Sequence, residues 1–256
     1  MKKTYLSVVI PAYNEHNNIK KGCLEQVISY LEKQSYSYEV LVVDDGSTDD
    51  TIKLAKVFAQ KHKNVKVLPQ PHRGKAGTVI AGMLAAEGEI VLFSDLDQAT
   101  PITQLEKILP KFSARGGQNF DIVIGSRAGR KGAGLLRLFM AYGFMVLRTI
   151  ILRLPYKDTQ CGFKAFSKKA IKPIFQRMQV FRKQQTVEGS AVTAGFDLEL
   201  LYIARKLKFS VAEVPVDWEE KGDRGKSGVN PIKDSYQGLR DMIRVRINAI
   251  LGRYKI

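Results

Sequence analysis

V-V-I-P-A-Y-N-E at residues 8–15 and V-V-D-D-G-S-T-D at residues 42–49 share one pattern, an apolar run that ends in polar and acidic residues. A third apolar run ends in S-D-L-D at residues 94–97. Runs that are apolar without alternation predict strands buried on both faces, which is typical of a parallel sheet covered by helices. Because such sheets bind ligands beyond the carboxyl ends of their strands, these polar residues are the candidate site residues.

Around these motifs, the first half of the chain alternates between segments with strand patterns and segments with helix patterns. The predicted strands are residues 6–10, 39–43, 65–68, 90–93 and 121–124, and the predicted helices between them are residues 19–31, 48–62, 76–86 and 102–111. Several βα units in succession predict an α/β fold with a doubly wound, mostly parallel sheet. We expect a catalytic domain over residues 1–230, followed by an amphipathic C-terminal helix over residues 231–256.

The distribution of charge indicates an anionic partner. The protein has 256 residues and a formal net charge of +16, and residues 127–183 contain fourteen Lys and Arg side chains but one acid, Asp158. A concentrated basic surface implies nucleic acid or anionic lipid headgroups. No aromatic residues are interleaved with the basic ones in the manner of a nucleic-acid surface. We therefore expect an anionic membrane surface and no nucleic acid, with nucleic-acid binding as the remote alternative.

Two segments of the second half are helical and amphipathic, at residues 133–154 and 232–251. In the first, the longest stretch without charge is ten residues, at 138–147, whereas a membrane span needs about twenty. Arg137 and Arg148 fall on nearly the same face of this helix. The pattern favours a helix that lies in the membrane interface. The alternative is that the two helices pack on each other or in a dimer.

The cysteines and the N-terminal segment indicate the cellular compartment of the protein. Cys23 and Cys161 are far apart in the sequence and give neither a disulfide framework nor a metal-binding spacing, so a reducing compartment is the simpler interpretation. The apolar run that ends at Pro11 lacks the length and the cleavage site of a signal peptide. We expect a protein bound peripherally to the cytoplasmic face of a membrane.

Two of the motifs suggest a diphosphate site. Asp95 and Asp97 follow a predicted buried strand at positions i and i+2, where they present oxygen ligands to a hard cation such as Mg²⁺ or Mn²⁺. Such a metal neutralises charge on a leaving diphosphate. The loop R-G-K-A-G at residues 73–77 brings Lys75 within reach of the same diphosphate, although it is not a Walker A loop.

Together these motifs, in this order and spacing, resemble the family-2 glycosyltransferases of the GT-A fold. I-G-S-R at residues 124–127, D-T-Q-C-G-F-K at 158–164, F-D-L-E-L-L at 196–201 and V-D-W at 216–218 extend the resemblance to most of the chain. These later motifs are similar to those of the subgroup that contains the dolichyl-phosphate β-glucosyltransferases and the dolichyl-phosphate mannose synthases.

The resemblance implies an inverting glycosyltransferase that moves a hexose, glucose from UDP-glucose, to a polyprenyl phosphate such as dolichyl or undecaprenyl phosphate. A GDP-mannose donor and a saccharide hydroxyl acceptor are the alternatives. The implied donor-binding residues are Pro11, Tyr13, Glu15, Asp45, Lys75, Asp95 and Lys226. The implied ligands of Mg²⁺ or Mn²⁺ are Asp95 and Asp97, the implied acceptor-phosphate residues are Arg127 and Arg137, and the implied catalytic residues are Asp97 and Arg127.

The resemblance bears on the need for a catalytic base and on the role of Arg127, and the sequence departs from it at one metal ligand. A phosphate monoester is already an anion near neutral pH, so no catalytic base is needed, and we expect His16, His62 and His72 at the surface. For Arg127, the alternative to phosphate binding is a salt bridge with a strand-end acid. The mannose synthases place a metal-binding glutamine two residues after the second aspartate, where this chain has Ala99, with Gln98 beside it.

Overall fold

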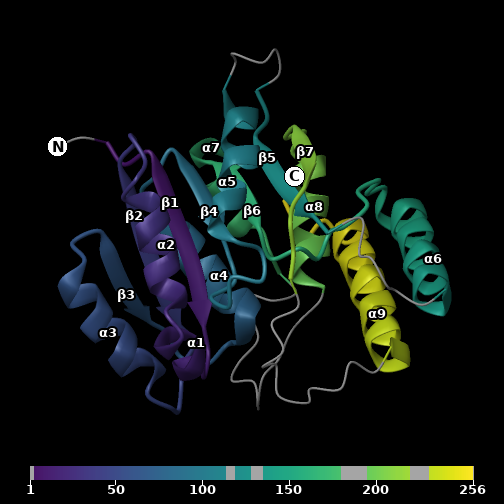
Figure 1. The fold of residues 1–256 in the computed structure, drawn as a ribbon. Helices are drawn as coiled ribbons and strands as arrows, with labels where there is room; N and C mark the ends of the chain where they lie inside the picture. The colour runs from purple at the N-terminus through teal and green to yellow at the C-terminus, as the bar shows by residue number, and fades with distance from the viewer. Residues whose placement is uncertain (1–2, 114–118, 128–134, 180–194, 220–230, 256) are drawn as a thin grey trace.

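The computed structural model describes residues 3–113, 119–127, 135–179, 195–219 and 231–255, with only the backbone path given for residues 135–141 and 231–235. Its centre is a seven-stranded sheet of order β3-β2-β1-β4-β6-β5-β7 (Figure 1). The strands are β1 Leu6–Ala12, β2 Tyr38–Asp44, β3 Val65–Pro69, β4 Ile90–Phe93, β5 Ile122–Ser126, β6 Lys164–Ser167 and β7 Val211–Pro215. Only β6, among the strands that the structure describes, runs antiparallel to its neighbours, β4 and β5. The prediction of a doubly wound, mostly parallel α/β sheet is confirmed, although β6 and β7 were not predicted.

The helices lie on both faces of the sheet and beyond its β7 edge (Figure 1). Their bounds are α1 His16–Lys20, α2 Cys23–Leu31, α3 Thr51–Lys61, α4 Gly74–Ala85, α5 Leu105–Ile108, α6 Leu135–Leu152, α7 Lys168–Phe175, α8 Phe196–Lys206 and α9 Pro231–Ile250. Two segments that were each predicted as one continuous helix are interrupted in the structure. Residues 19–31 are divided at Gly22, whose φ of 80° breaks the helix. Residues 102–111 are a short α-helix between two 3₁₀ turns, Ile102–Gln104 and Leu109–Phe112.

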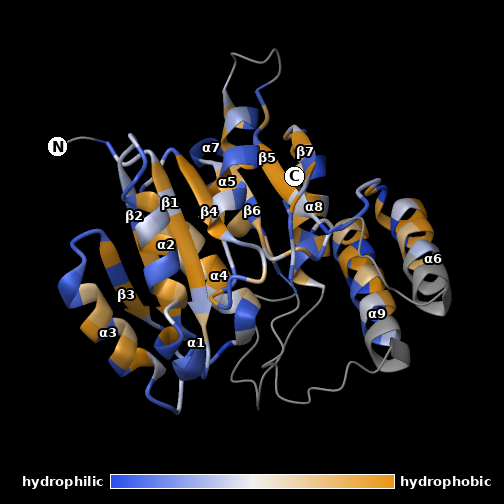
Figure 2. Ribbon diagram, in the orientation of Figure 1, coloured by the Kyte–Doolittle hydropathy of each residue, from blue (hydrophilic) through white to orange (hydrophobic). Residues whose placement is uncertain are grey.

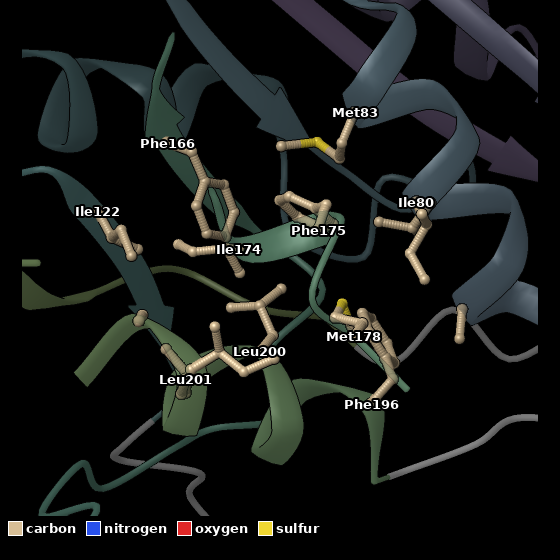
Figure 3. Close-up of a cluster of buried hydrophobic side chains, with 14 of the residues drawn as sticks. Ile80, Met83, Ile122, Phe166, Ile174, Phe175, Met178, Phe196, Leu200 and Leu201 are labelled. Atoms are coloured by element: carbon tan, nitrogen blue, oxygen red, sulfur yellow. The ribbon is translucent and has the colours of Figure 1, made fainter. Parts of the chain in front are cut away.

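Alternate residues of each strand feed two cores on opposite faces of the sheet. In β1, Val9 packs into one core while Val8 and Ile10 pack into the other, as the period of two requires. Figure 2 shows β1 and β4 as almost continuously hydrophobic. Figure 3 shows the first core, where Phe166 of β6 meets Phe175 of α7 and residues of α4 and α8. Both faces of the sheet are therefore covered, which leaves the strand ends for ligands.

Helices α6 and α9 pack side by side beyond β7, and α9 also packs on α8 (Figure 1). Met242 and Val245 of α9 are buried in the same core as α8. By length and hydropathy, the described part of the chain contains no helix that qualifies as a membrane span. Arg148, which helical periodicity places on nearly the same face as Arg137, is 3% exposed because its side chain turns into the protein. The side chain of Arg137 lies outside the described residues.

Candidate active site

The carboxyl ends of β1, β2 and β4 meet at one edge of the sheet, as the sequence predicts for parallel strands (Figure 1). Asp45 follows β2, Asp95 and Asp97 follow β4, and Glu15 follows β1. Burial raises the pKa of Glu15. A hydrogen bond from Asn18 opposes that rise, while the charges of Asp97 and Asp95 add to it. Glu15 therefore belongs to the same group of acids as Asp95 and Asp97.

Asp45 is tied to a histidine that the sequence analysis placed at the surface. Its side chain is buried and accepts hydrogen bonds from the backbone N–H of Arg73 at 2.8 Å and from His72 Nδ1 at 3.0 Å. His72 Nδ1 also lies 3.0 Å from the carbonyl oxygen of Asp45, and because both partners are acceptors, Nδ1 carries the proton. The ring of Tyr13 stacks on His72, with centroids 4.2 Å apart.

The surface expectation for His72 was thus wrong, since its side chain is 18% exposed. The structure brings Tyr13 and Asp45 together through this histidine, and a flat, partly buried surface results. Pro11 is in β1, in register with Val43 of β2. No local sequence pattern predicts this grouping, because the three side chains come from three separate segments of the chain.

Lys75, from the first turn of α4, forms an ion pair with Asp95 Oδ1. Burial lowers the pKa of Lys75, but Asp95, Asp197 and Asp97 together raise it above its ordinary value. The ammonium group therefore stays charged among carboxylates. On its other side the Asp95 carboxylate lies against Gly162, where an added Cβ would stand 2.7 Å from Asp95 Cγ. The Asp95 carboxylate therefore lies between the ammonium group of Lys75 and the backbone of Gly162.

The turn that contains Asp97 is fixed by hydrogen bonds to the chain around it. Asp97 Oδ1 accepts the backbone N–H of Ala99 at 3.0 Å. The carboxamide of Gln98 donates to the carbonyl oxygen of Asp95 at 3.0 Å and accepts the N–H of Ile102 at 3.0 Å. Gln98 is buried, so it stabilises the turn and does not face a ligand. Ala99 has no side chain that could replace the glutamine of the mannose synthases.

The two aspartates fit a hard divalent cation through their chemistry. Mg²⁺ and Mn²⁺ are commonly held by one or two carboxylates together with phosphate oxygens of the substrate. Asp95 already pairs with one cation, the ammonium group of Lys75. Among the described residues, no group of three or more His, Cys, Asp and Glu side chains is arranged to hold a metal ion.

A buried ion pair that the sequence analysis did not predict joins β6 to α8. Lys164, at the start of β6, has its Nζ 2.8 Å from Asp197 Oδ1 in the first turn of α8. The Lys164 side chain is fully buried, and it also donates to the carbonyl oxygen of Cys161. Burial raises the pKa of Asp197 although the positive charge of Lys164 lowers it. The pair lies near the candidate site, because the charges of Lys75 and Asp95 also act on the pKa of Asp197.

Arg127, the residue after β5, forms the salt bridge that the sequence analysis left as its alternative role, though with Asp158 in place of a strand-end acid. Arg127 Nε donates to Asp158 Oδ2 at 2.6 Å, Nη2 donates to Oδ1 at 2.9 Å, and the backbone N–H donates to Oδ2 at 3.0 Å. The guanidinium also lies over the ring of Trp218, at 5.9 Å from its centroid. Burial alone would raise the pKa of Asp158, but Arg127 lowers it to about 2.

Two predicted site residues cannot be placed. Lys226 lies outside the described residues, and for Arg137 only the backbone of α6 is described. The described site therefore brings together Glu15, Asp95, Asp97 and Lys75, with Tyr13 and Asp45 joined through His72.

A mixed sheet with acids and a lysine at its carboxyl edge defines an α/β protein with a ligand site at the strand ends. The comparison of sequences gives its class. The model of the glycosyl transferase family 2 matches residues 7–175, and the chain belongs to that family. It is a glycosyltransferase.

Within the family, the chain is similar to dolichyl-phosphate β-glucosyltransferases. It is 33% identical to the one from Dictyostelium discoideum, over 98% of this chain and 77% of that protein. It is 33% identical to the one from Homo sapiens, over 98% of this chain and 78% of that protein. One from Trichomonas vaginalis is 38% identical over 86% of this chain and 66% of its own length.

Solved structures confirm the GT-A fold. Glucosyl-3-phosphoglycerate synthase from Mycobacterium tuberculosis aligns with a TM-score of 0.62 at 20% identity, over 100% of this chain and 82% of that one. A complex of that enzyme with Mn²⁺, UDP and glucosyl-3-phosphoglycerate aligns with a TM-score of 0.55 at 22% identity, over 100% of this chain and 81% of that one.

Proposed function

We propose that this glycosyltransferase moves glucose from UDP-glucose to the phosphate of dolichyl phosphate or a related polyprenyl phosphate, with inversion at the anomeric carbon. The observation that carries the proposal is the acidic, lysine-containing group at the carboxyl edge of the sheet. Arg127 follows β5, a strand of the same sheet whose carboxyl end lies at that edge. The curated relatives are named for glucosyl transfer to dolichyl phosphate, and they match nearly the whole chain.

The donor side is assigned from the contacts already described. The stacked pair of Tyr13 and His72, with Asp45 behind it, offers a flat surface and a hydrogen-bonding edge to a nucleoside. Pro11, Glu15 and Lys226 complete the predicted donor set. Lys75, with Asp95 and Asp97, faces the diphosphate. Asp95 and Asp97 would hold Mg²⁺ or Mn²⁺, which supplies neutralisation of the diphosphate charge when bound.

On the acceptor side, a phosphate oxygen of the lipid forms a bond to the anomeric carbon while the bond from that carbon to the diphosphate breaks, and UDP leaves. Because the attacking phosphate is an anion, its alignment and charge compensation are what the protein has to supply. Arg127 suits this task, since a guanidinium stays charged and binds phosphate through paired hydrogen bonds. Arg137 is the second predicted acceptor residue.

A panel of nucleotide sugars tests the proposal. With dolichyl phosphate and Mn²⁺ present, UDP-glucose should give a lipid-linked glucose, and GDP-mannose, UDP-N-acetylglucosamine and UDP-galactose should give much less. The readout is radioactive sugar in the organic phase, followed by chromatography of the lipid product. Product formed only from GDP-mannose, or only with saccharide acceptors, would contradict the assignment and favour one of the alternatives.

The surface of α6 and α9 supports contact with a membrane. These helices expose the large apolar side chains Tyr142, Leu147, Ile150, Tyr236, Ile243, Ile247 and Ile250, and Leu251 follows them. Arg240, Arg244 and Arg246 are exposed among the apolar residues of α9, and the one acid in the described side chains of that helix, Asp241, is buried. Apolar and cationic groups on one surface match an anionic leaflet. We assign this surface to the cytoplasmic face of the membrane that contains the acceptor.

Flotation with vesicles tests the membrane surface. The protein should bind vesicles that contain phosphatidylserine, and about 0.5 M salt should release it, because attraction between exposed charges is screened within a Debye length. Arg244→Glu/Arg246→Glu should bind more weakly. Lys53→Glu/Lys56→Glu is the matched control, since it makes the same charge change on α3, at the opposite side of the molecule (Figure 1).

Thermal unfolding of both pairs excludes a folding defect as the cause. Equal binding to neutral and anionic vesicles would argue against the surface as assigned. Tight DNA binding without lipid binding would favour the remote alternative, a nucleic-acid-binding protein.

A further inference from the structure

Arg148 is a buried cation outside the donor and acceptor groups described above. It lies near the end of α6, and its side chain turns away from the exposed apolar surface into the segment that follows the helix. Its Nε donates to the carbonyl oxygen of Leu154 at 3.3 Å, its Nη1 donates to Thr159 Oγ1 at 3.2 Å, and its Nη2 donates to the carbonyl oxygen of Tyr156. A guanidinium with three acceptors in one short segment fixes the path of that segment.

The same segment is held from the other side by Glu213 of β7. Glu213 accepts the backbone N–H of Lys157 at 2.9 Å and that of Asp158 at 2.7 Å. Two of the residues that accept hydrogen bonds from Arg148 are Tyr156 and Thr159. They lie in sequence on either side of the two residues that Glu213 holds. Asp158 is the residue at the centre of this arrangement, fixed through its backbone by neighbours on both sides.

The carboxylate of Asp158 in turn fixes Arg127 through the hydrogen bonds to Nε and Nη2. A continuous series of contacts thus runs from α6 through Arg148, the segment 154–159 and Asp158 to Arg127. Each contact uses a directional hydrogen bond, and Arg148, Thr159 and Asp158 are all buried or nearly so, so a change at one end displaces the next group.

We propose that Arg148 is a positioning residue that couples helix α6 to Arg127 and so sets the geometry of the acceptor-phosphate site. The proposal rests on the proposed function, because it takes Arg127 as the acceptor ligand. As a consequence, a displacement of α6, the helix assigned to the membrane surface, would also displace Arg127, the arginine assigned to the lipid phosphate. Arg148 itself touches neither substrate.

The test is Arg148→Lys, which keeps the charge but replaces a planar fork by a single ammonium that cannot span the three acceptors. We expect the KM for dolichyl phosphate to rise about tenfold, one step of 1.4 kcal/mol, while the dissociation constant of UDP-glucose stays within about threefold. Arg153→Lys is the matched control, since Arg153 is exposed just beyond the end of the same helix, and it should behave as wild type. Equal losses of donor and acceptor affinity would overturn the proposal in favour of a general folding role.

A double-mutant cycle separates this proposal from the assignment of Arg127. If Arg148 acts through Arg127, Arg148→Lys should not weaken binding of a short-chain polyprenyl phosphate further once Arg127→Ala is present. Additive losses would overturn the coupling. If Arg127→Ala alone leaves acceptor affinity unchanged, the acceptor role of Arg127 fails instead. Should Arg148→Lys not fold, Thr159→Val removes the buried Nη1 acceptor at nearly constant volume and should raise the same KM; a normal KM would count against the coupling.

Discussion

Gly162→Ala should lower kcat/KM by about a hundredfold while the protein remains folded. The Cβ of an alanine at this position would stand 2.7 Å from Asp95 Cγ, which is closer than real Cβ contacts allow. The Asp95 carboxylate must therefore move, which breaks its ion pair with Lys75 and separates it from its position beside Asp97. The φ of Gly162 is not in the left-handed region, so the backbone accepts alanine without strain. Steady-state kinetics with UDP-glucose and thermal unfolding measure the two effects.

Gly143→Ala is the matched control for this substitution. It adds the same methyl group, but no heavy atom lies within 4 Å of the new Cβ. Since Gly143 is inside α6, alanine should leave activity unchanged and stabilise the helix by roughly 0.5–1 kcal/mol. Wild-type turnover and donor affinity in Gly162→Ala would demonstrate that the position of Asp95 is not needed, and the D-x-D assignment would fail with it.

The residues that sequence reasoning placed correctly are those whose role depends on local order along the chain. Asp45, Asp95 and Asp97 follow apolar runs, and an apolar run without alternation can be recognised as a buried strand from composition alone. The topology of parallel strands then brings their ends together without further information. Five of the seven strands and the acidic side of the candidate site follow from this reasoning.

What the sequence did not predict depends on partners from distant segments. Lys164 begins β6 as a charged residue in a strand of four residues. Asp197 of α8 and the carbonyl oxygen of Cys161 make its burial possible. His72 looks like a loop residue until Tyr13 and Asp45 enclose it. A periodic pattern describes which face of an element a residue occupies, and it carries no information on which distant group will pair with it.

Arg148 is a different case, because its partners are close in sequence. Helical periodicity places it on nearly the same face as Arg137, in a helix predicted to lie at the membrane. The segment after α6 instead folds back and offers two backbone carbonyls and a threonine hydroxyl to the guanidinium. Backbone carbonyls in an irregular segment leave no signature in the sequence, so a buried arginine of this kind cannot be told from a surface one by pattern.

Arg127→Ala should abolish transfer to dolichyl phosphate while the dissociation constant of UDP-glucose stays within about threefold. The reason is that Arg127 follows β5, whereas Asp95 follows β4 and Lys75 begins α4. The described hydrogen bonds of its guanidinium go to Asp158 and not to the predicted donor-binding residues. Calorimetric titration with UDP-glucose gives the donor affinity, and the lipid-product assay gives the transfer rate. If donor affinity falls together with activity, the arginine serves the donor side.

Because Arg127 also pairs with Asp158, Arg127→Ala should change the stability of the protein as well as its activity. Asp158 has a pKa of about 2, below its ordinary value of 3.8, so the pair contributes stability above pH 3.8 that is lost as the pH falls through 2. At neutral pH the contribution is about 2 kcal/mol. Because burial alone would raise the pKa of Asp158, Arg127→Ala should lower the free energy of unfolding by at least that amount at pH 7 and by little near pH 2.

A second variant separates the two roles of Arg127. In Arg127→Ala/Asp158→Asn the buried carboxylate is no longer charged, so most of the lost stability should return, because an uncharged amide needs no cation beside it. Transfer to dolichyl phosphate should stay abolished, since no group in the variant replaces the guanidinium at the acceptor phosphate. Recovery of transfer together with stability would mean that Arg127 serves only as the partner of Asp158, and the acceptor assignment would then have to move to another cation.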